Sequence, residues 1–123
     1  MLNGEITEKI IGCAIEVHRE LGPGLLESAY EECLCFVLTE HNISTKRQVT
    51  IPLTFRGKKV NCGYRADLIV EEKVILEIKA IEAINDLHVA QLLTYLKVTR
   101  MRTGLIVNFN VPVLKQGIVR LVN

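Results

Sequence analysis

Three charged residues lie inside two apolar segments near the middle of the chain. Asp67 falls within residues 64–70, and Glu77 and Lys79 fall within residues 74–80. A buried carboxylate or ammonium group is costly unless it is paired, so charges in such segments need a partner or a function. Two carboxylates can hold Mg²⁺ or Mn²⁺ through oxygen atoms, and a neighbouring lysine can stabilise an attacking water or the charge that develops on a phosphate.

The two segments are expected to form a β-hairpin joined by residues 71–73. Because side chains alternate faces along a strand, the loop length decides which residues face one another. A three-residue loop sets Asp67 opposite Glu77. The same register places Arg65 opposite Lys79, whereas a two-residue loop mixes the polar and apolar faces. The three-residue loop is therefore preferred, and the side chains of residues 60, 62, 64, 66, 68 and 70 are expected to share the opposite face.

Spacing alone leaves two interpretations of these charges open. In the first, Asp67 and Glu77 bind a divalent cation, which removes the repulsion between two adjacent carboxylates. In the second, the charges form a ladder of cross-strand ion pairs on a solvated face, an arrangement that contributes little to stability. Further motifs along the chain favour the first interpretation.

Asp67 and the run Glu77-Ile78-Lys79 resemble the PD-(D/E)xK motif of the restriction-endonuclease-like nuclease superfamily, with Ala66 where that motif often has proline. A second segment, Gly-Leu-Leu-Glu-Ser-Ala-Tyr at residues 24–30, resembles the signature of the GxxExxY protein family, a small prokaryotic branch of the same superfamily. Residues 17–24, 88–95 and 104–110 fit this branch as well. The resemblance therefore covers nearly the whole chain.

The resemblance implies a metal-dependent nuclease that hydrolyses phosphodiester bonds, with DNA as the favoured substrate and Mg²⁺ or Mn²⁺ as the cofactor. It implies that Asp67, Glu77 and the Ile78 carbonyl hold the metal. Glu27 would reach this metal, a second metal or a bound water, and Lys79 would position and polarise the attacking water. In-line attack would leave a 5′-phosphate and a 3′-hydroxyl.

Other site candidates have an alternative structural explanation. On spacing alone, Glu27 is a first-turn glutamate that complements a helix dipole, and the resemblance supplies its catalytic role. Gln91 and Tyr95 lie four residues apart and resemble the QxxxY motif of the RecB-like branch, although an amphipathic helix with a polar edge explains them too. The implied catalytic residues are Glu27, Asp67, Glu77, Lys79 and Gln91, and the candidate substrate contacts are Arg65, His88 and Tyr95. His18 is expected to be structural, and Tyr30 is expected to be a core aromatic whose hydroxyl orients Glu27.

The periodicity of apolar residues predicts the elements that position these side chains. Helices are predicted over residues 5–21, 25–41 and 87–99, and strands over residues 49–55, 59–70, 74–80, 104–109 and 118–122. Pro52 favours an edge position for the first strand. The core order α-α-β-β-β-α-β predicts a single α/β domain over residues 1–123, with a mixed sheet between helices, as in the restriction-endonuclease-like core.

Composition limits the remaining possibilities. The chain has 123 residues, is 49% hydrophobic and carries a net charge of +1, which argues against a strongly basic coat for nucleic acid. A local basic patch around the first predicted hairpin is possible, and a solvated edge that blocks strand pairing is the alternative. The patch consists of Lys46, Arg47, Arg56, Lys58, Lys59 and Arg65.

The four cysteines and the start of the chain bear on location and partners. Cys13, Cys33, Cys35 and Cys62 lack metal-binding spacing and are expected to be buried free thiols. With neither a signal sequence nor a membrane-spanning run, a cytoplasmic protein is expected. The small size suggests that a homodimer or a partner protein helps to grip the substrate. The alternative function is a non-catalytic domain that binds nucleic acid or protein and retains the nuclease fold.

Overall fold

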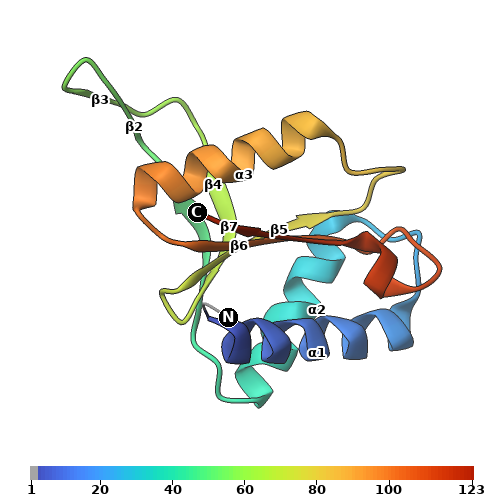
Figure 1. The fold of residues 1–123 in the computed structure, drawn as a ribbon. Helices are drawn as coiled ribbons and strands as arrows, with labels where there is room; N and C mark the ends of the chain where they lie inside the picture. Colours follow the sequence, from blue (N-terminus) through green and yellow to red (C-terminus); the bar gives the residue numbers. More distant parts are fainter. Residues whose placement is uncertain (1–2) are drawn as a thin grey trace.

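The protein has three layers, with a five-stranded sheet between helices (Figure 1). The computed structural model describes residues 3–123. Helices α1 (Gly4–Leu21) and α2 (Glu27–Glu40) cover one face of the sheet, and α3 (Asp86–Thr99) covers the other. The strands of the sheet are β1 (Thr45–Thr50), β4 (Arg65–Val70), β5 (Val74–Lys79), β6 (Thr103–Asn108) and β7 (Ile118–Val122). The expected α/β class with helices on both faces is thus confirmed.

The sheet is mixed, with the strand order β1-β4-β5-β6-β7. Strands β5 and β6 are parallel and are connected through α3, whereas the other neighbouring pairs are antiparallel. All six residues of β6 are buried, as expected for a strand with both faces covered. A short 3₁₀ helix, η1 (Leu114–Gly117), precedes β7, and β7 confirms the final strand predicted over residues 118–122.

Two hydrophobic clusters hold the layers together. The larger cluster lies between α1, α2 and the sheet and includes Ile10, Leu34, Leu76 and Phe109. The smaller cluster lies beneath α3 and includes Leu92, Leu96, Ile75 and Ile106. Because β5 contributes residues to both clusters in alternation, this central strand is fixed from both sides.

The β1 region differs from the expected continuous strand over residues 49–55. The strand in the main sheet ends at Thr50, and β2 (Leu53–Phe55) belongs to a separate two-stranded sheet with β3 (Lys58–Val60). Pro52 lies between them because proline has no N–H to donate to a ladder. β1 does occupy an edge of the main sheet, but Pro52 is outside the strand.

The predicted strand over residues 59–70 is divided as well. β3 ends at Val60 and β4 begins at Arg65, with a link between them that contains Gly63 in a left-handed conformation, at φ 85°. A residue with a Cβ rarely adopts this conformation, so the strand cannot run straight through the link. The link also exposes Cys62, and the expectation of four buried thiols is wrong at this position.

The cysteines and helices give two further results. All four cysteines are free, with Cys13 buried and Cys33 and Cys35 half-buried. Within residues 3–123, no helix combines the length and the apolar character needed to cross a membrane.

A close contact between Gly117 and β6 predicts a strong effect on stability. A Cβ atom at Gly117 would lie 2.1 Å from the Asn108 carbonyl oxygen, which is part of the backbone and cannot move aside alone. Gly117→Ala should therefore lower the free energy of unfolding by about 2–3 kcal/mol or more. Chemical denaturation followed by circular dichroism measures this loss.

Gly12→Ala is the matched control, since Gly12 lies within α1 and a Cβ there has no atom within 4 Å. Alanine in an exposed helix interior should stabilise the protein by about 0.5–1 kcal/mol. Equal effects of the two substitutions would contradict the close approach of η1 to β6.

Candidate active site

Asp67 and Glu77 lie where β4 and β5 separate. The antiparallel ladder runs Val70–Val74, Ile69–Ile75 and Leu68–Leu76, which confirms the three-residue loop. Beyond Leu68 and Leu76, hydrogen bonds between backbone N–H groups and side-chain carboxylates replace the backbone bonds of the ladder. The Asp67 N–H donates to Glu77 Oε2 at 2.8 Å, and the Ile78 N–H donates to Asp67 Oδ2 at 2.8 Å. The strands therefore form a fork that is bridged by the two carboxylates.

The fork changes two features of the expected register. Ala66 packs in the cluster beneath α3, whereas Leu68 packs in the cluster beneath α1 and α2, so the expected alternation of faces is wrong at Asp67. On its β1 side Arg65 pairs with Thr50, and on its β5 side the ladder ends at Leu68 and Leu76, before Arg65 could pair with Lys79. Both differences follow from the end of the β4–β5 ladder, because strands that separate no longer share one pleat.

The carboxylates in the fork are in an unfavourable environment for negative charge. The side chain of Glu77 is buried, and burial together with the charge of Asp67 raises its pKa from 4.5 to about 8. Burial also raises the pKa of Asp67, while the Ile78 N–H and the charge of Lys79 oppose that rise. A further positive charge at the fork would favour the ionised forms of both groups.

Glu27 reaches the end of β5 from the first turn of α2. Its Oε2 atom accepts a hydrogen bond of 3.4 Å from the N–H of Ala80, the residue after Lys79. The charge of Glu27 also contributes to the raised pKa of Glu77. The structure thus places Glu27 beside the end of β5, within the electrostatic influence of Glu77.

The loop before α2 accounts for the spacing of Gly24, Glu27 and Tyr30. Gly24 has φ 100°, which favours glycine. The Tyr30 hydroxyl donates to the Gly22 carbonyl and accepts from the Leu25 N–H, while its ring stacks on Phe109 at 4.4 Å. The expected contact between the Tyr30 hydroxyl and Glu27 is absent among the described residues. Tyr30 instead fixes the loop from which Glu27 begins the helix.

Glu31 is a buried acidic residue that the sequence prediction did not include in the site. It is 8% exposed and accepts hydrogen bonds from Arg47 at 2.9 Å and from Gln48 at 2.8 Å. Gln48 also lies 3.5 Å from Asp67 Oδ1, and the charge of Glu31 contributes to the raised pKa of Asp67. Its position four residues after Glu27, on the same helix face, was the available signal.

Asn108 is the second residue that the prediction missed. This side chain is 2% exposed, accepts from the Ile81 N–H at 3.1 Å and donates to the Ile81 carbonyl at 2.9 Å. These two bonds hold the chain just after Lys79 against the end of β6. A single asparagine at the end of an apolar strand gives no specific sequence signal for this role.

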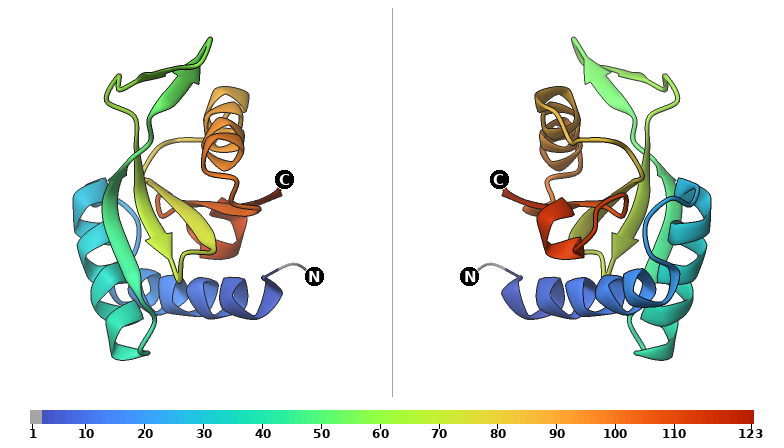
Figure 2. Two further views of the ribbon diagram at one scale, coloured as in Figure 1. Left: turned by 90° about the vertical axis from the view of Figure 1, so that its left-hand side faces the viewer. Right: turned by 90° about the vertical axis from the view of Figure 1, so that its right-hand side faces the viewer.

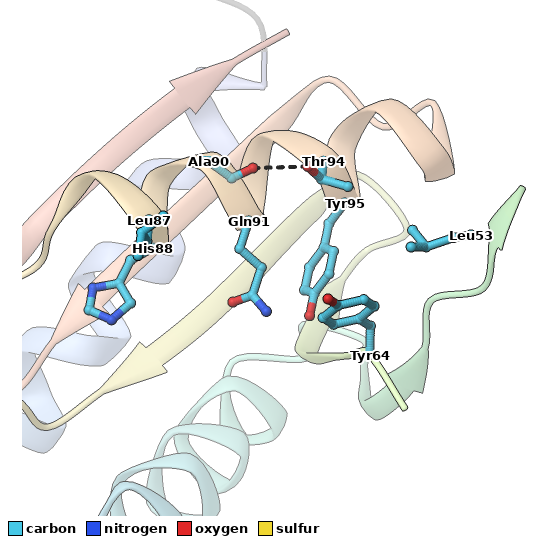
Figure 3. A pocket seen from close by; sticks show the side chains of 8 residues that line it. All are labelled: Leu53, Tyr64, Leu87, His88, Ala90, Gln91, Thr94 and Tyr95. Atoms are coloured by element: carbon cyan, nitrogen blue, oxygen red, sulfur yellow. Dashed lines mark hydrogen bonds between the residues drawn. The ribbon is translucent and has the colours of Figure 1, made fainter. Parts of the chain in front are cut away.

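Helix α3 has a polar edge that includes Gln91 and Tyr95 (Figure 3). The side chains of Gln91 and Tyr95 extend from it in the same direction, and the Tyr64 ring lies edge-on to that of Tyr95 at 6.1 Å. Burial and then the charge of Glu77 raise the pKa of Tyr95 to about 12. These residues line a pocket of about 410 Å³ together with Leu53, Leu87, His88, Ala90 and Thr94.

Two histidines have structural contacts. Nε2 of His18, which is buried, lies 2.8 Å from the Val111 carbonyl oxygen, so the expected structural role of His18 is confirmed. His88 Nδ1 accepts from the Asn85 N–H at 3.1 Å, and the Asn85 side chain accepts from the His88 N–H at 3.1 Å. This reciprocal capping box begins α3, with Asn85 as its N-cap.

A second group of potential metal ligands lies away from the fork. Cys13, Glu16 and His41 have ligand atoms within 4.8 Å of one another. However, burial and the charge of Glu16 raise the pKa of the Cys13 thiol, and His41 is bonded to Glu16 at 3.0 Å. A thiol held in its neutral form is a poor metal ligand. His41 follows the last turn of α2, about 20 Å along the helix from Glu27.

The donor atoms at the fork suit a hard divalent cation. Asp67, Glu77 and Glu27 all supply carboxylate oxygens, and Mg²⁺ and Mn²⁺ prefer oxygen ligands. One oxygen of each strand carboxylate accepts from a backbone N–H, which orients the carboxylate. The second oxygen of Asp67 has only the long contact of 3.5 Å with Gln48. Chemically, these residues can hold a cation beside the Lys79 ammonium.

The raised pKa of Glu77 predicts how the stability of the metal-free protein depends on pH. Since the folded pKa of about 8 exceeds the ordinary 4.5, the folded state binds this proton more tightly than the unfolded state. The free energy of unfolding should therefore fall as pH rises from about 4.5 to about 8, and level off above that range. Denaturation midpoints in EDTA, measured across this range, test the slope.

Glu77→Gln should remove most of this pH dependence because glutamine does not titrate. Glu5→Gln, at a side chain that is 89% exposed, is the matched control and should retain the slope. A wild-type protein whose stability rises over the same pH range would contradict the electrostatics described for the fork.

Comparison with known proteins places this geometry in a family. No curated protein and no solved structure shows significant similarity to the chain. The family model of the PD-(D/E)XK nuclease superfamily matches residues 4–121. That match spans both strands of the fork, α2 and α3, although it does not distinguish the GxxExxY branch within the superfamily. On this match, the chain belongs to the PD-(D/E)XK nuclease superfamily.

Proposed function

We propose that this protein is a metal-dependent nuclease that hydrolyses phosphodiester bonds, with DNA as its substrate. The observation that carries the proposal is the exchange of hydrogen bonds between Asp67 and Glu77 at the fork. Glu27 supports it, since its Oε2 atom accepts from the N–H of Ala80, the residue after Lys79. Membership of a nuclease superfamily gives the reaction class. A fork that only stabilised the fold would not need a buried Glu77 whose pKa is raised by burial and by the neighbouring charge of Asp67.

Asp67 and Glu77, with the carbonyl of Ile78, would hold Mg²⁺ or Mn²⁺ in this proposal. Glu27 would bind the same cation, a second cation or a water at its edge. When bound, the cation would polarise the scissile phosphate and lower the pKa of a coordinated water. Its positive charge would also favour the ionised forms of Asp67 and Glu77, which burial and neighbouring negative charge disfavour.

Lys79 would act directly on the reacting groups. It follows Glu77 by two residues on β5, so both side chains leave the strand on one face. Its ammonium group would position the attacking water and stabilise the charge on the phosphorane, leaving a 5′-phosphate and a 3′-hydroxyl. Gln91 would steady the site from α3.

Arg65, Tyr95 and His88 would contact the substrate beside the reacting phosphate. Arg65 is exposed at the start of β4, two residues before Asp67. Tyr95 lies within the electrostatic influence of Glu77. The Nδ1 atom of His88 is used by the capping box, which leaves Nε2 for a phosphate oxygen.

The proposal includes the setting of the enzyme. A single domain over residues 1–123, of the GxxExxY type and from a prokaryotic cytoplasm, would act as a homodimer or with a partner protein. The second candidate is a non-catalytic domain that binds nucleic acid or protein. The presence of all three motif charges, Asp67, Glu77 and Lys79, favours the enzyme, because a site without catalysis has no need of them.

Mn²⁺ or Mg²⁺ should stabilise the folded protein through the fork. At about 100 times its Kd, a cation that binds only the folded state adds about 2.7 kcal/mol to the free energy of unfolding. Asp67→Asn should remove most of this gain, as measured by thermal unfolding with and without Mn²⁺. Asp86→Asn, an exposed position in the first turn of α3, is the control. Equal gains in wild type and Asp67→Asn would mean that the ion binds elsewhere.

Lys79→Ala should remove detectable cleavage while it preserves metal binding and most nucleic-acid affinity. Loss of one group that stabilises the transition state typically costs on the order of 10²–10³ in rate. The measurement is a panel of single- and double-stranded DNA and RNA incubated with Mg²⁺ or Mn²⁺. Lys73→Ala, in the exposed turn between β4 and β5, is the matched control and should cleave normally. If the wild type cuts nothing in the panel, the non-catalytic candidate is preferred.

A further inference from the structure

Positive charge is concentrated in one part of the chain. Residues 41–66 contain none of the 14 acidic residues but six of the 15 lysines and arginines, although the whole chain has a net charge of only +1. Lys46 and Arg47 are neutralised by ion pairs with Glu72 and with the α2 carboxylates. Among residues 3–123, no such ion pair involves the remaining cations near the β2–β3 hairpin.

The β2–β3 hairpin projects from the body of the protein (Figure 2). Its register pairs Leu53 with Val60, Thr54 with Lys59, and Phe55 with Lys58. Since paired residues share a face, Lys58 and Lys59 lie on opposite faces of the ribbon. The hairpin therefore presents a cation on each side.

The tip of the hairpin has an unusual residue in its turn. Arg56 and Gly57 both have positive φ, at 51° and 77°, as in a type I′ turn. Asparagine or glycine adopts the first of these conformations more easily than arginine does. The Arg56 guanidinium lies 5.2 Å from the centre of the Phe55 ring, which is 63% exposed. The tip thus carries a cation held over an exposed aromatic ring.

The hairpin has few contacts of its own to stabilise it. It contains three residue pairs, and a two-stranded ribbon of this kind is marginal without a surface to pack against. Because the ribbon carries a lysine on each face, its complement is a negatively charged surface that borders it on both sides. The major groove of duplex DNA is about 12 Å wide, admits a two-stranded ribbon and is bordered by phosphates on both sides.

The base of the hairpin is continuous with the candidate active site. Leu53 of β2 and Tyr64, just after β3, line the same pocket as Gln91 and His88 of α3 (Figure 3). The next residue after Tyr64 begins β4, which leads directly to Asp67. A nucleic acid that lies along the hairpin can therefore extend over the pocket to the fork.

We propose that the β2–β3 hairpin is a second contact for nucleic acid. The hairpin enters the major groove of duplex DNA and binds its phosphates through Lys58 and Lys59. Arg56 and Phe55 form the tip that enters the groove. The inference rests on the proposed function, because it identifies nucleic acid as the ligand. It adds duplex DNA as the substrate class, and it assigns DNA binding to residues outside the reacting group.

The test compares binding by two double variants in a Lys79→Ala background, which prevents cleavage. A fluorescent 30-base-pair duplex is titrated at several salt concentrations with Lys58→Ala/Lys59→Ala and with Lys97→Ala/Lys115→Ala. The second pair removes the same charge from exposed positions on α3 and η1. Loss of two phosphate contacts should lower the slope of log Kd against log salt by about 2, whereas the control should leave the slope unchanged.

The same titration on a single strand of equal length tests whether duplex DNA is the ligand. If the hairpin variant lowers the slope on the single strand as much as on the duplex, the choice of duplex DNA is overturned. An unchanged slope for the hairpin variant, or an equal loss in the control, would overturn the contact itself. Sedimentation shows whether the hairpin variant changes the oligomeric state, and a shift from dimer to monomer would make the hairpin an interface between two copies. Circular dichroism should show unchanged folding.

Cleavage by the protein with intact Lys79 separates the two proposals. If hairpin-dependent binding is found without cleavage, the proposed nuclease activity fails and the hairpin contact stands. If the protein cleaves DNA and the hairpin variant binds like the control, the hairpin contact fails and the nuclease activity stands.

Discussion

The exchange of hydrogen bonds between two carboxylates and the backbone at the β4–β5 fork is the constraint on which the site depends. Asp67 and Glu77 each accept from a backbone N–H of the opposite strand, which replaces ladder bonds by side-chain bonds. Charge-assisted bonds of this kind are stronger than neutral ones and fix the direction of each carboxylate. The two strands can separate without leaving these buried N–H groups unpaired. Without the exchange, separation of the strands would leave the N–H groups of Asp67 and Ile78 unsatisfied. Backbone pairing between β4 and β5 would then continue past this point.

Two sets of contacts in the surrounding structure fix the residues beside the fork. Tyr30 stacks on Phe109 and bonds to the loop before α2, so Glu27 begins its helix at a fixed position relative to β5. Asn108 holds the chain after Lys79 to the end of β6. Each contact joins the site to the sheet core rather than to another exposed loop. A site on rigid elements keeps its geometry without a ligand, which reduces the entropy lost when a cation or a substrate binds.

The sequence predicted the hairpin that carries the candidate site more fully than its surroundings, for physical reasons. Charges within apolar strands have few explanations, and the loop length set the register correctly from Val70–Val74 onward. The end of the ladder at Asp67 was missed because periodicity assumes continuous pairing, whereas the break comes from side-chain bonds to the backbone. Glu31 and Asn108 were missed because their roles depend on contacts between distant segments. Pro52 predicted an edge position for a continuous strand, whereas its actual consequence, a separate hairpin, required the three-dimensional path of the chain.

The distribution of charge has a consequence for any polyanionic ligand. The three carboxylates at the fork would repel a phosphate backbone, and the single Lys79 ammonium offsets only part of that repulsion. A cation bound at the fork reduces the local repulsion but acts over a short range in physiological salt, where screening reaches about 8 Å. Attraction of a long nucleic acid therefore has to come from elsewhere on the surface. The absence of acidic residues from positions 41–66 leaves that segment as a positive surface directly before Asp67. In the proposed function, the reacting residues and the substrate-binding residues are thus separated along the chain, and the link between β3 and β4 joins the two.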